Sequence, residues 1–285
     1  MNQDSSPLGP LLDEFAHYLV AKWKEDFEHR FPISRHHAWN SWRNHPASGA
    51  TDFWFCASLY EASDRYSWQA EAPAEWTGEL QEALHSHDAV RAFEVCKQIF
   101  RWGGVARSPN NRSRLWIHNQ GKELPQKIRC AVNLLKDPTK NLAVFNGTEF
   151  LMNSAMTKIY WAADEAKQLV IYDGRVGAAL GLLARGFLKS RGLSIVPDEL
   201  KFLWGASRDP YVIGIKNKRN PSESSLVFPA LFSPARNDYG HATMVRRASH
   251  LLQRVAEMLG ANVSVLDLEK AFFMVGYDVR HWVHT

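Results

Sequence analysis

The residues best suited to chemistry lie between positions 153 and 176. Lys158 follows a polar turn at Asn153 and Ser154, and Asp173 closes an apolar stretch 15 residues after Lys158. A carboxylate can stabilise a developing positive charge or orient a water molecule, and a desolvated lysine amine can act as a nucleophile. About two to three helical turns and a short return would separate the two side chains. We therefore expect both to face one cleft.

Two helices joined by a short extended link must position these two side chains. The pattern predicts a helix over 154–166 with Ser154 as its N-cap, an apolar link over 169–172, and a second helix over 174–190. Asp173 directly precedes the second helix, so it is also a candidate N-cap, a role that requires no catalysis. The two roles are compatible, because the amides at a helix N-terminus favour a nearby negative charge.

The segment resembles the active-site region of the helix-hairpin-helix DNA glycosylases, the superfamily of endonuclease-III-like and 8-oxoguanine glycosylases. In that family a hairpin leads into a helix that carries a lysine in bifunctional members. An aspartate, a basic residue and an aliphatic residue then open the next helix. Residues 153–158 match the hairpin and helix start, and residues 171–176 match the aspartate motif. Ser154 and Met156 stand where the family has its two hairpin glycines. The resemblance covers residues 145–190.

The resemblance implies a DNA glycosylase, which hydrolyses the N-glycosidic bond of a damaged or modified base and leaves an abasic site. Asp173 would stabilise the sugar cation or orient water, and Lys158, if desolvated, would attack the sugar C1′ and add lyase activity. The substrate is either a lesion, in DNA repair, or a bulky modified phage base, in a bacterial antiviral defence. No cofactor is implied. Two alternatives stay open, a non-enzymatic helical DNA-binding protein and a helical protein-interaction module.

Positive charge is concentrated in segments that could contact DNA phosphates. The formal net charge is +4, and residues 101–129 hold seven Arg or Lys residues but only one acidic residue, Glu123. A solvated basic face without a ligand is the alternative explanation. The candidate DNA contacts come from the polar 110–114 loop, the hairpin and the aspartate motif: Asn111, Arg112, Arg114, Ser154, Thr157 and Arg175.

A base must leave the duplex before its bond to the sugar can be attacked, and aromatic side chains can line the pocket that receives it. The chain holds 11 Trp residues, although a Trp at helical spacing is more often part of the core. The pocket candidates lie in or near the segments above: Trp102, Trp116, Tyr160 and Trp161. His36, His37 and His45 have no standard metal-ligand spacing, so we predict no metal site.

The composition and periodicity predict an all-α protein, and the resemblance to the glycosylases implies a two-lobed helical fold. With 285 residues, 45% hydrophobic and 22% charged, the chain is typical of a globular protein. We place an N-terminal helical lobe at 1–85 and a catalytic, DNA-binding lobe at 86–285, and a single domain is the alternative. One long helix is predicted over 11–31, with Leu12, Phe15, Leu19, Trp23 and Phe27 on its apolar face and Pro32 as its stop. Further helices are predicted from Asp88 to Gly103, from Pro197 to Trp204, and after Ser264, the N-cap candidate of the last helix. Nucleotide-binding and zinc-protease motifs are absent from the sequence. The three cysteines are scattered, and the sequence shows neither a signal peptide nor a membrane span. We therefore predict a cytoplasmic protein, and we expect it to be a monomer.

Overall fold

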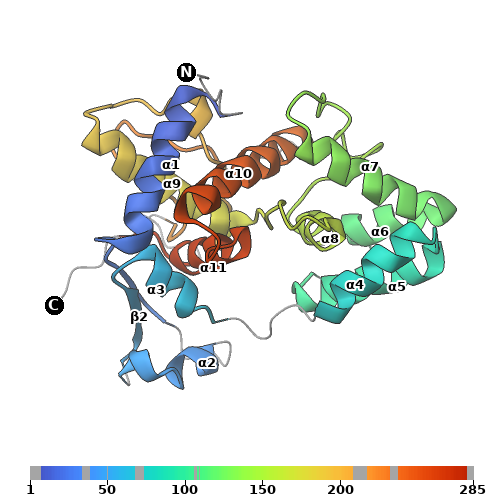
Figure 1. Ribbon diagram of the computed structural model, residues 1–285, viewed down its shortest axis with the longest axis horizontal. Coiled ribbons are helices and arrows are strands. Elements are labelled where there is room, and N and C mark those ends of the chain that lie inside the picture. The colour runs from blue at the N-terminus through green and yellow to red at the C-terminus, as the bar shows by residue number, and fades with distance from the viewer. Residues whose placement is uncertain are drawn as a thin grey trace. The chain divides into compact units, whose positions relative to one another are not determined.

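The computed structural model describes residues 8–33, 39–49, 51–67, 74–105, 108, 110–207, 217–231 and 237–280. The chain is mostly helical, with 57% helix and 5% strand, which confirms the expected all-α class. Eleven α-helices lie within the described ranges (Figure 1). None of the described helices combines the length and apolar character that a membrane span requires.

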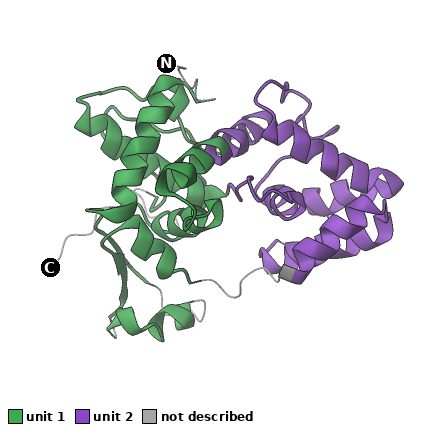
Figure 2. Ribbon diagram, in the orientation of Figure 1, with its two compact units in different colours: residues 1–69, 173–235, 250–285 green, residues 70–172, 236–249 purple. Residues whose placement is uncertain are grey.

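The contacts divide the chain into two compact units, and neither is continuous in the sequence. Unit 1 comprises residues 1–69, 173–235 and 250–285, and unit 2 comprises residues 70–172 and 236–249 (Figure 2). Asp173 therefore opens a segment of unit 1, whereas Lys158 belongs to unit 2. Residues 238–249 of the long helix α10 (Asp238–Leu259) belong to unit 2, and residues 250–259 belong to unit 1.

The predicted helix over 11–31 is shorter in the structure. Helix α1 (Pro10–Lys24) ends where Glu25 becomes extended, and β1 (His29–Pro32) pairs antiparallel with β2 (Phe53–Cys56). The prediction was wrong for residues 25–31, because pairing with a distant strand overrides a helical spacing of apolar residues. The buried side chains of α1 do follow the predicted stripe: Leu12, Phe15, Ala16, Leu19 and Trp23.

Unit 1 is built around α9 (Gly174–Ser190), whose bounds agree with the prediction. Helix α11 (Val265–Val275) packs against α9 and against α3 (Leu59–Asp64), and α1 also contacts both α3 and α9. A capping box between Ser264 and Asp267 starts α11. The remaining short elements of the unit are α2 (Asn40–Arg43) and the 3₁₀ turns η2 (Pro46–Ser48) and η4 (Asp198–Leu200). The helix that we predicted from Pro197 to Trp204 is reduced to η4.

Unit 2 is a bundle in which α8 (Met156–Ala163) lies against α4 (Ala74–His85), α5 (Ala89–Trp102) and α7 (Leu124–Lys136) (Figure 1). Asp88 caps α5 by accepting the N–H of Arg91, and α5 ends at Gly103, as predicted. The same unit holds α6 (Arg112–Asn119) and the 3₁₀ turn η3 (Gly121–Glu123).

The three cysteines differ in burial, which predicts their reactivity. Burial raises the pKa of Cys56 and of Cys96 to about 12, whereas Cys130 is exposed on α7. Because the thiolate is the reactive species, an aromatic disulfide reagent at pH 8 should label only Cys130 in the folded protein. Denaturant should expose the other two thiols. Fast labelling that persists in Cys130→Ser would contradict this expectation.

Candidate functional site

Asp173 is the N-cap of α9, as the sequence predicts. Its Oδ1 accepts the N–H of Arg175 at 2.7 Å and the N–H of Val176 at 3.1 Å. The side chain is half-buried, and the described residues make no hydrogen bond to its second oxygen, Oδ2. The cap therefore fixes the carboxylate at the positive end of a 17-residue helix and leaves one oxygen for other chemistry.

The apolar link that leads into Asp173 belongs to no helix or sheet and is buried. The exposed fractions of Leu169, Val170 and Tyr172 are 1% or less. Its start is anchored by Asp164, which is 1% exposed and accepts the N–H of Leu169 at 2.9 Å. The same carboxylate accepts the N–H of Gln168 and pairs with Lys136 Nζ at 2.9 Å. Hydrogen bonds from both backbone and side chain thus offset the cost of burying this charge.

Two glycines allow close packing around the first turn of α9. A Cβ on Gly174 would lie 2.7 Å from the Cα of Gly205. A Cβ on Gly276, which follows α11, would overlap the carbonyl group of Arg175. Only glycine permits such contacts between backbones. The sequence pattern did not single out Gly276, because its importance depends on a partner about a hundred residues away.

Arg175, a predicted DNA contact, packs against aromatic rings of unit 1. Its guanidinium lies 4.2 Å from the ring centre of Phe273 and 5.1 Å from that of Tyr277. Burial lowers the pKa of Arg175 to about 10, and the nearby charge of Arg219 acts in the same direction while Asp173 opposes it. Arg175 therefore stays cationic at neutral pH and is held by cation–π contacts. Its contact with DNA stays a prediction.

Ser154 does not cap α8 as predicted, and the Asn153 side chain instead holds the turn that precedes the helix. Asn153 Oδ1 accepts the N–H of Ala155 at 2.9 Å and of Met156 at 3.1 Å. The Oγ of Ser154 is buried and has no hydrogen-bond partner among the described residues. An amide side chain reaches amides two and three positions ahead, and Asn153 precedes the helix start at that spacing. The helix runs from Met156 to Ala163, so it is also shorter than the predicted 154–166.

Lys158 and Thr157 both donate hydrogen bonds to the carbonyl of Ser154. The distance is 2.8 Å from Lys158 Nζ and 3.1 Å from Thr157 Oγ1. Thr157 is 1% exposed, and the Lys158 side chain passes so close to Gly103 that a Cβ there would overlap it. Thus Lys158, half-buried in unit 2, is turned back toward the first turn of its own helix.

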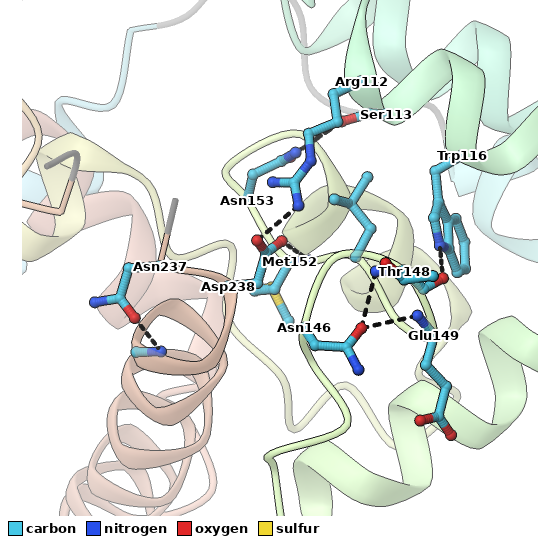
Figure 3. A network of polar contacts seen from close by, with 12 residues as sticks. Arg112, Ser113, Trp116, Asn146, Thr148, Glu149, Met152, Asn153, Asn237 and Asp238 are labelled. Carbon is cyan, nitrogen blue, oxygen red and sulfur yellow. Dashed lines mark hydrogen bonds and ion pairs between the residues drawn. The ribbon is translucent and has the colours of Figure 1, made fainter. Parts of the chain in front are cut away.

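The 110–114 segment, predicted to be an exposed loop, is instead the start of α6. Asn111 caps this helix by accepting the N–H of Ser113 at 3.1 Å and of Arg114 at 3.2 Å. Ser113 is 2% exposed, and its hydroxyl is hydrogen-bonded to the Asn153 amide group (Figure 3). Arg114 lies with its guanidinium 5.8 Å from the ring centre of Phe100. The prediction of an exposed loop was wrong from Arg112 onward, where the chain is helical, whereas Asn110 is an exposed turn residue.

A buried carboxylate, Asp238, ties this region together (Figure 3). It is 4% exposed, accepts the N–H of Met152 at 2.9 Å, and pairs with Arg112 Nη2 at 2.7 Å. Gly147, with φ +85°, provides the space, because a Cβ there would overlap the Arg112 guanidinium. Arg112, a predicted DNA contact, thus has a structural partner. Its contribution to DNA binding stays a prediction.

The four aromatic pocket candidates fall into two groups. Trp116 and Tyr160 are buried, and their polar atoms donate to the carbonyls of Thr148 and Leu151 respectively. Tyr160 has an exposed fraction of 0%, so neither face of its ring is open to a base. Trp102 and Trp161 are half-buried and stack with ring centres 6.4 Å apart and an interplanar angle of 20°. They are the two candidates that are not buried.

No group of three potential metal ligands occurs within the part of the chain that the structure describes. His36 and His37 lie outside the described residues.

No family model matches the chain, and no curated protein and no solved structure matches it.

Proposed function

We propose that the protein is a DNA glycosylase, which hydrolyses the N-glycosidic bond of a damaged or modified base and leaves an abasic site. The observation that carries the proposal is the Asp173 carboxylate, which two amides hold through Oδ1 while Oδ2 makes no hydrogen bond within the described residues. A carboxylate held in place before the reaction can stabilise charge that develops later without the cost of reorganisation. The proposal includes the two-lobed helix-hairpin-helix glycosylase fold that the sequence resemblance implies.

The proposed reaction places positive charge on the deoxyribose. As the bond between C1′ and the base nitrogen breaks, its electron pair leaves with the base and the sugar becomes cationic. Water then forms a bond to C1′ and loses a proton. Asp173 Oδ2 would lie beside the cation, orient the water and accept that proton. Arg175, whose guanidinium packs on the rings of Phe273 and Tyr277, would hold the turn in place and not donate a proton.

The state of the Lys158 amine would determine whether the enzyme also cleaves the DNA strand. A lyase step needs the neutral amine to attack C1′ and form a Schiff base. The 2.8 Å hydrogen bond from Nζ to the Ser154 carbonyl instead holds the amine as a donor. We therefore propose base removal as the main activity, with strand cleavage only after Lys158 leaves this carbonyl. DNA is the partner, and its phosphates would meet exposed cations of unit 2: Arg101, Lys122 and Arg129.

The test is an assay for abasic sites on duplexes that each contain one oxidised, alkylated, mismatched or glucosylated hydroxymethylated base. We expect base release from at least one duplex, seen as strand breaks after alkali treatment. Breaks before alkali would report lyase activity. Affinity for DNA should fall steeply as salt rises, because phosphate contacts release counterions.

The outcomes separate the functional classes. Salt-dependent binding without base release on any duplex would favour the non-enzymatic DNA-binding protein, in which Asp173 only caps α9. Binding that does not depend on salt, or no binding at all, would exclude both nucleic-acid functions and leave a helical protein-interaction module. Among positive results, the identity of the released base distinguishes a repair enzyme from one directed at phage DNA.

A further inference from the structure

We propose that His241 is a positioning residue for Asp173, so that α10 controls the geometry of base removal. The inference rests on the proposed function. His241 lies in the first turn of α10 and is 2% exposed. Its Nε2 lies 2.8 Å from the carbonyl oxygen of Tyr172, the residue directly before Asp173. A carbonyl can only accept, so Nε2 carries the proton and donates.

The bond acts on the peptide group that Asp173 shares. The carbonyl of Tyr172 and the N–H of Asp173 belong to one planar unit, so the direction of one sets the direction of the other. The rings of His241 and Tyr172 also meet edge to face, with centres 5.8 Å apart and an interplanar angle of 69°. The hydrogen bond and the ring contact together therefore fix the backbone at Tyr172, directly before Asp173.

A second side chain of α10 holds the same link. Ser249 is 1% exposed, and its Oγ accepts the N–H of Val170 at 3.1 Å. The link is buried but belongs to no sheet, so its backbone groups cannot find partners in neighbouring strands. Buried backbone groups require partners, and here α10 supplies them from side chains. Helix α10 thus holds the link at Val170 and at Tyr172, and His241 holds the end next to the proposed catalytic carboxylate.

The test compares His241→Ala, His241→Gln and a control, His17→Gln, on the exposed face of α1. Single-turnover base release at saturating DNA should fall by about 10- to 100-fold in His241→Ala, because small misplacements of a catalytic group have large effects. Its Kd for DNA should change by less than about twofold, since His241 makes no DNA contact in this proposal. Gln can place an N–H near the position of Nε2, so His241→Gln should recover most of the rate.

Hydrogen exchange of the free protein provides a readout that does not depend on activity. Amides of residues 170–177 should exchange faster in His241→Ala than in the wild type, and His17→Gln should match the wild type. If His241→Ala does not fold, Ser249→Ala tests the same clamp from its other end and should also accelerate exchange and slow base release. Unchanged rates, or equal losses in the Ala and Gln variants with unchanged exchange, would overturn the inference.

Failure of the proposed function gives a different result. If the wild type releases no base from any duplex, the glycosylase proposal fails and His241 has no reaction to assist. Exchange at 170–177 then still decides whether His241 holds the link, so the two failures are distinguishable.

Discussion

Asp173→Asn is expected to remove most of the base-release activity and to leave the fold and the affinity for DNA unchanged. Asn and Asp are equally good N-caps, and the amide oxygen of Asn can accept the same two N–H groups of Arg175 and Val176. The substitution removes only the negative charge. If that charge stabilises the sugar cation, the single-turnover rate should fall by about 100- to 1,000-fold, the size expected for losing one preorganised electrostatic group.

A second capping aspartate provides a matched control. Asp88 caps α5 in unit 2 through the N–H of Arg91, at 2.9 Å, and no catalytic role is proposed for it. Asp88→Asn should change neither the melting temperature nor the rate of base release. The comparison therefore separates the effect of charge from the effect of capping.

The measurements are abasic-site formation under single-turnover conditions, Kd for the same DNA, and thermal unfolding. A rate for Asp173→Asn within about threefold of the wild type would show that the carboxylate only caps α9. A loss of rate accompanied by a large drop in melting temperature would mean that the variant fails for structural reasons. In that case Asp173→Ser, which can also cap, repeats the test.

Gly276→Ala is expected to destabilise unit 1 more than the other substitutions considered for this fold. The new Cβ would overlap the carbonyl and approach the Cα of Arg175, which are backbone atoms that cannot rotate away. Gly276 itself has φ −75°, which any residue can adopt, so the effect comes from packing alone. We expect a loss of about 3 kcal/mol or more in the free energy of unfolding, at the upper end for overpacking.

Gly78→Ala is the control for Gly276→Ala. Gly78 lies inside α4 on an exposed face, and a Cβ there would have nothing within 4 Å. Alanine is favoured over glycine within a helix, so this variant should gain up to about 1 kcal/mol. Urea unfolding of the two variants measures both changes. Equal stabilities for Gly276→Ala and the wild type would mean that position 276 does not pack tightly against the first turn of α9.

This packing also bears on the proposed site. Arg175 supplies one of the two N–H groups that hold Asp173, and its carbonyl is the group that Gly276 approaches. A bulky residue at position 276 would therefore move the turn that fixes the carboxylate. Activity should fall in Gly276→Ala even at temperatures where the variant is folded.

Several features of the fold were determined by the sequence alone, because they depend on residues close together in the chain. Asp173 caps α9, Asp88 caps α5 and Ser264 caps α11, as predicted. A capping side chain and the amides that it binds lie within three residues of each other, so a short pattern contains all the information. The burial of the 169–172 link also followed from its apolar side chains.

Other features could be decided only by the tertiary structure. The turn before α8 is held by Asn153, whose amide group is hydrogen-bonded to Ser113, forty positions earlier, whereas the hydroxyl of Ser154 is buried without a partner among the described residues. The 110–114 segment is polar in sequence, yet its Arg112 forms an ion pair with the buried carboxylate of Asp238. A helix was predicted to include Phe27 and the residues of β1, but these residues are not helical because β1 pairs with β2.

His241 and Gly276 show the same limit at the proposed site. Each acts on the backbone around Asp173, through the carbonyl of Tyr172 and the carbonyl of Arg175, from a helix far along the chain. Local sequence patterns identified the carboxylate, because its capping partners are its neighbours. They could not identify the residues that hold the carboxylate's backbone, because a backbone carbonyl is the same in every residue and carries no signal about the distant side chain that will reach it.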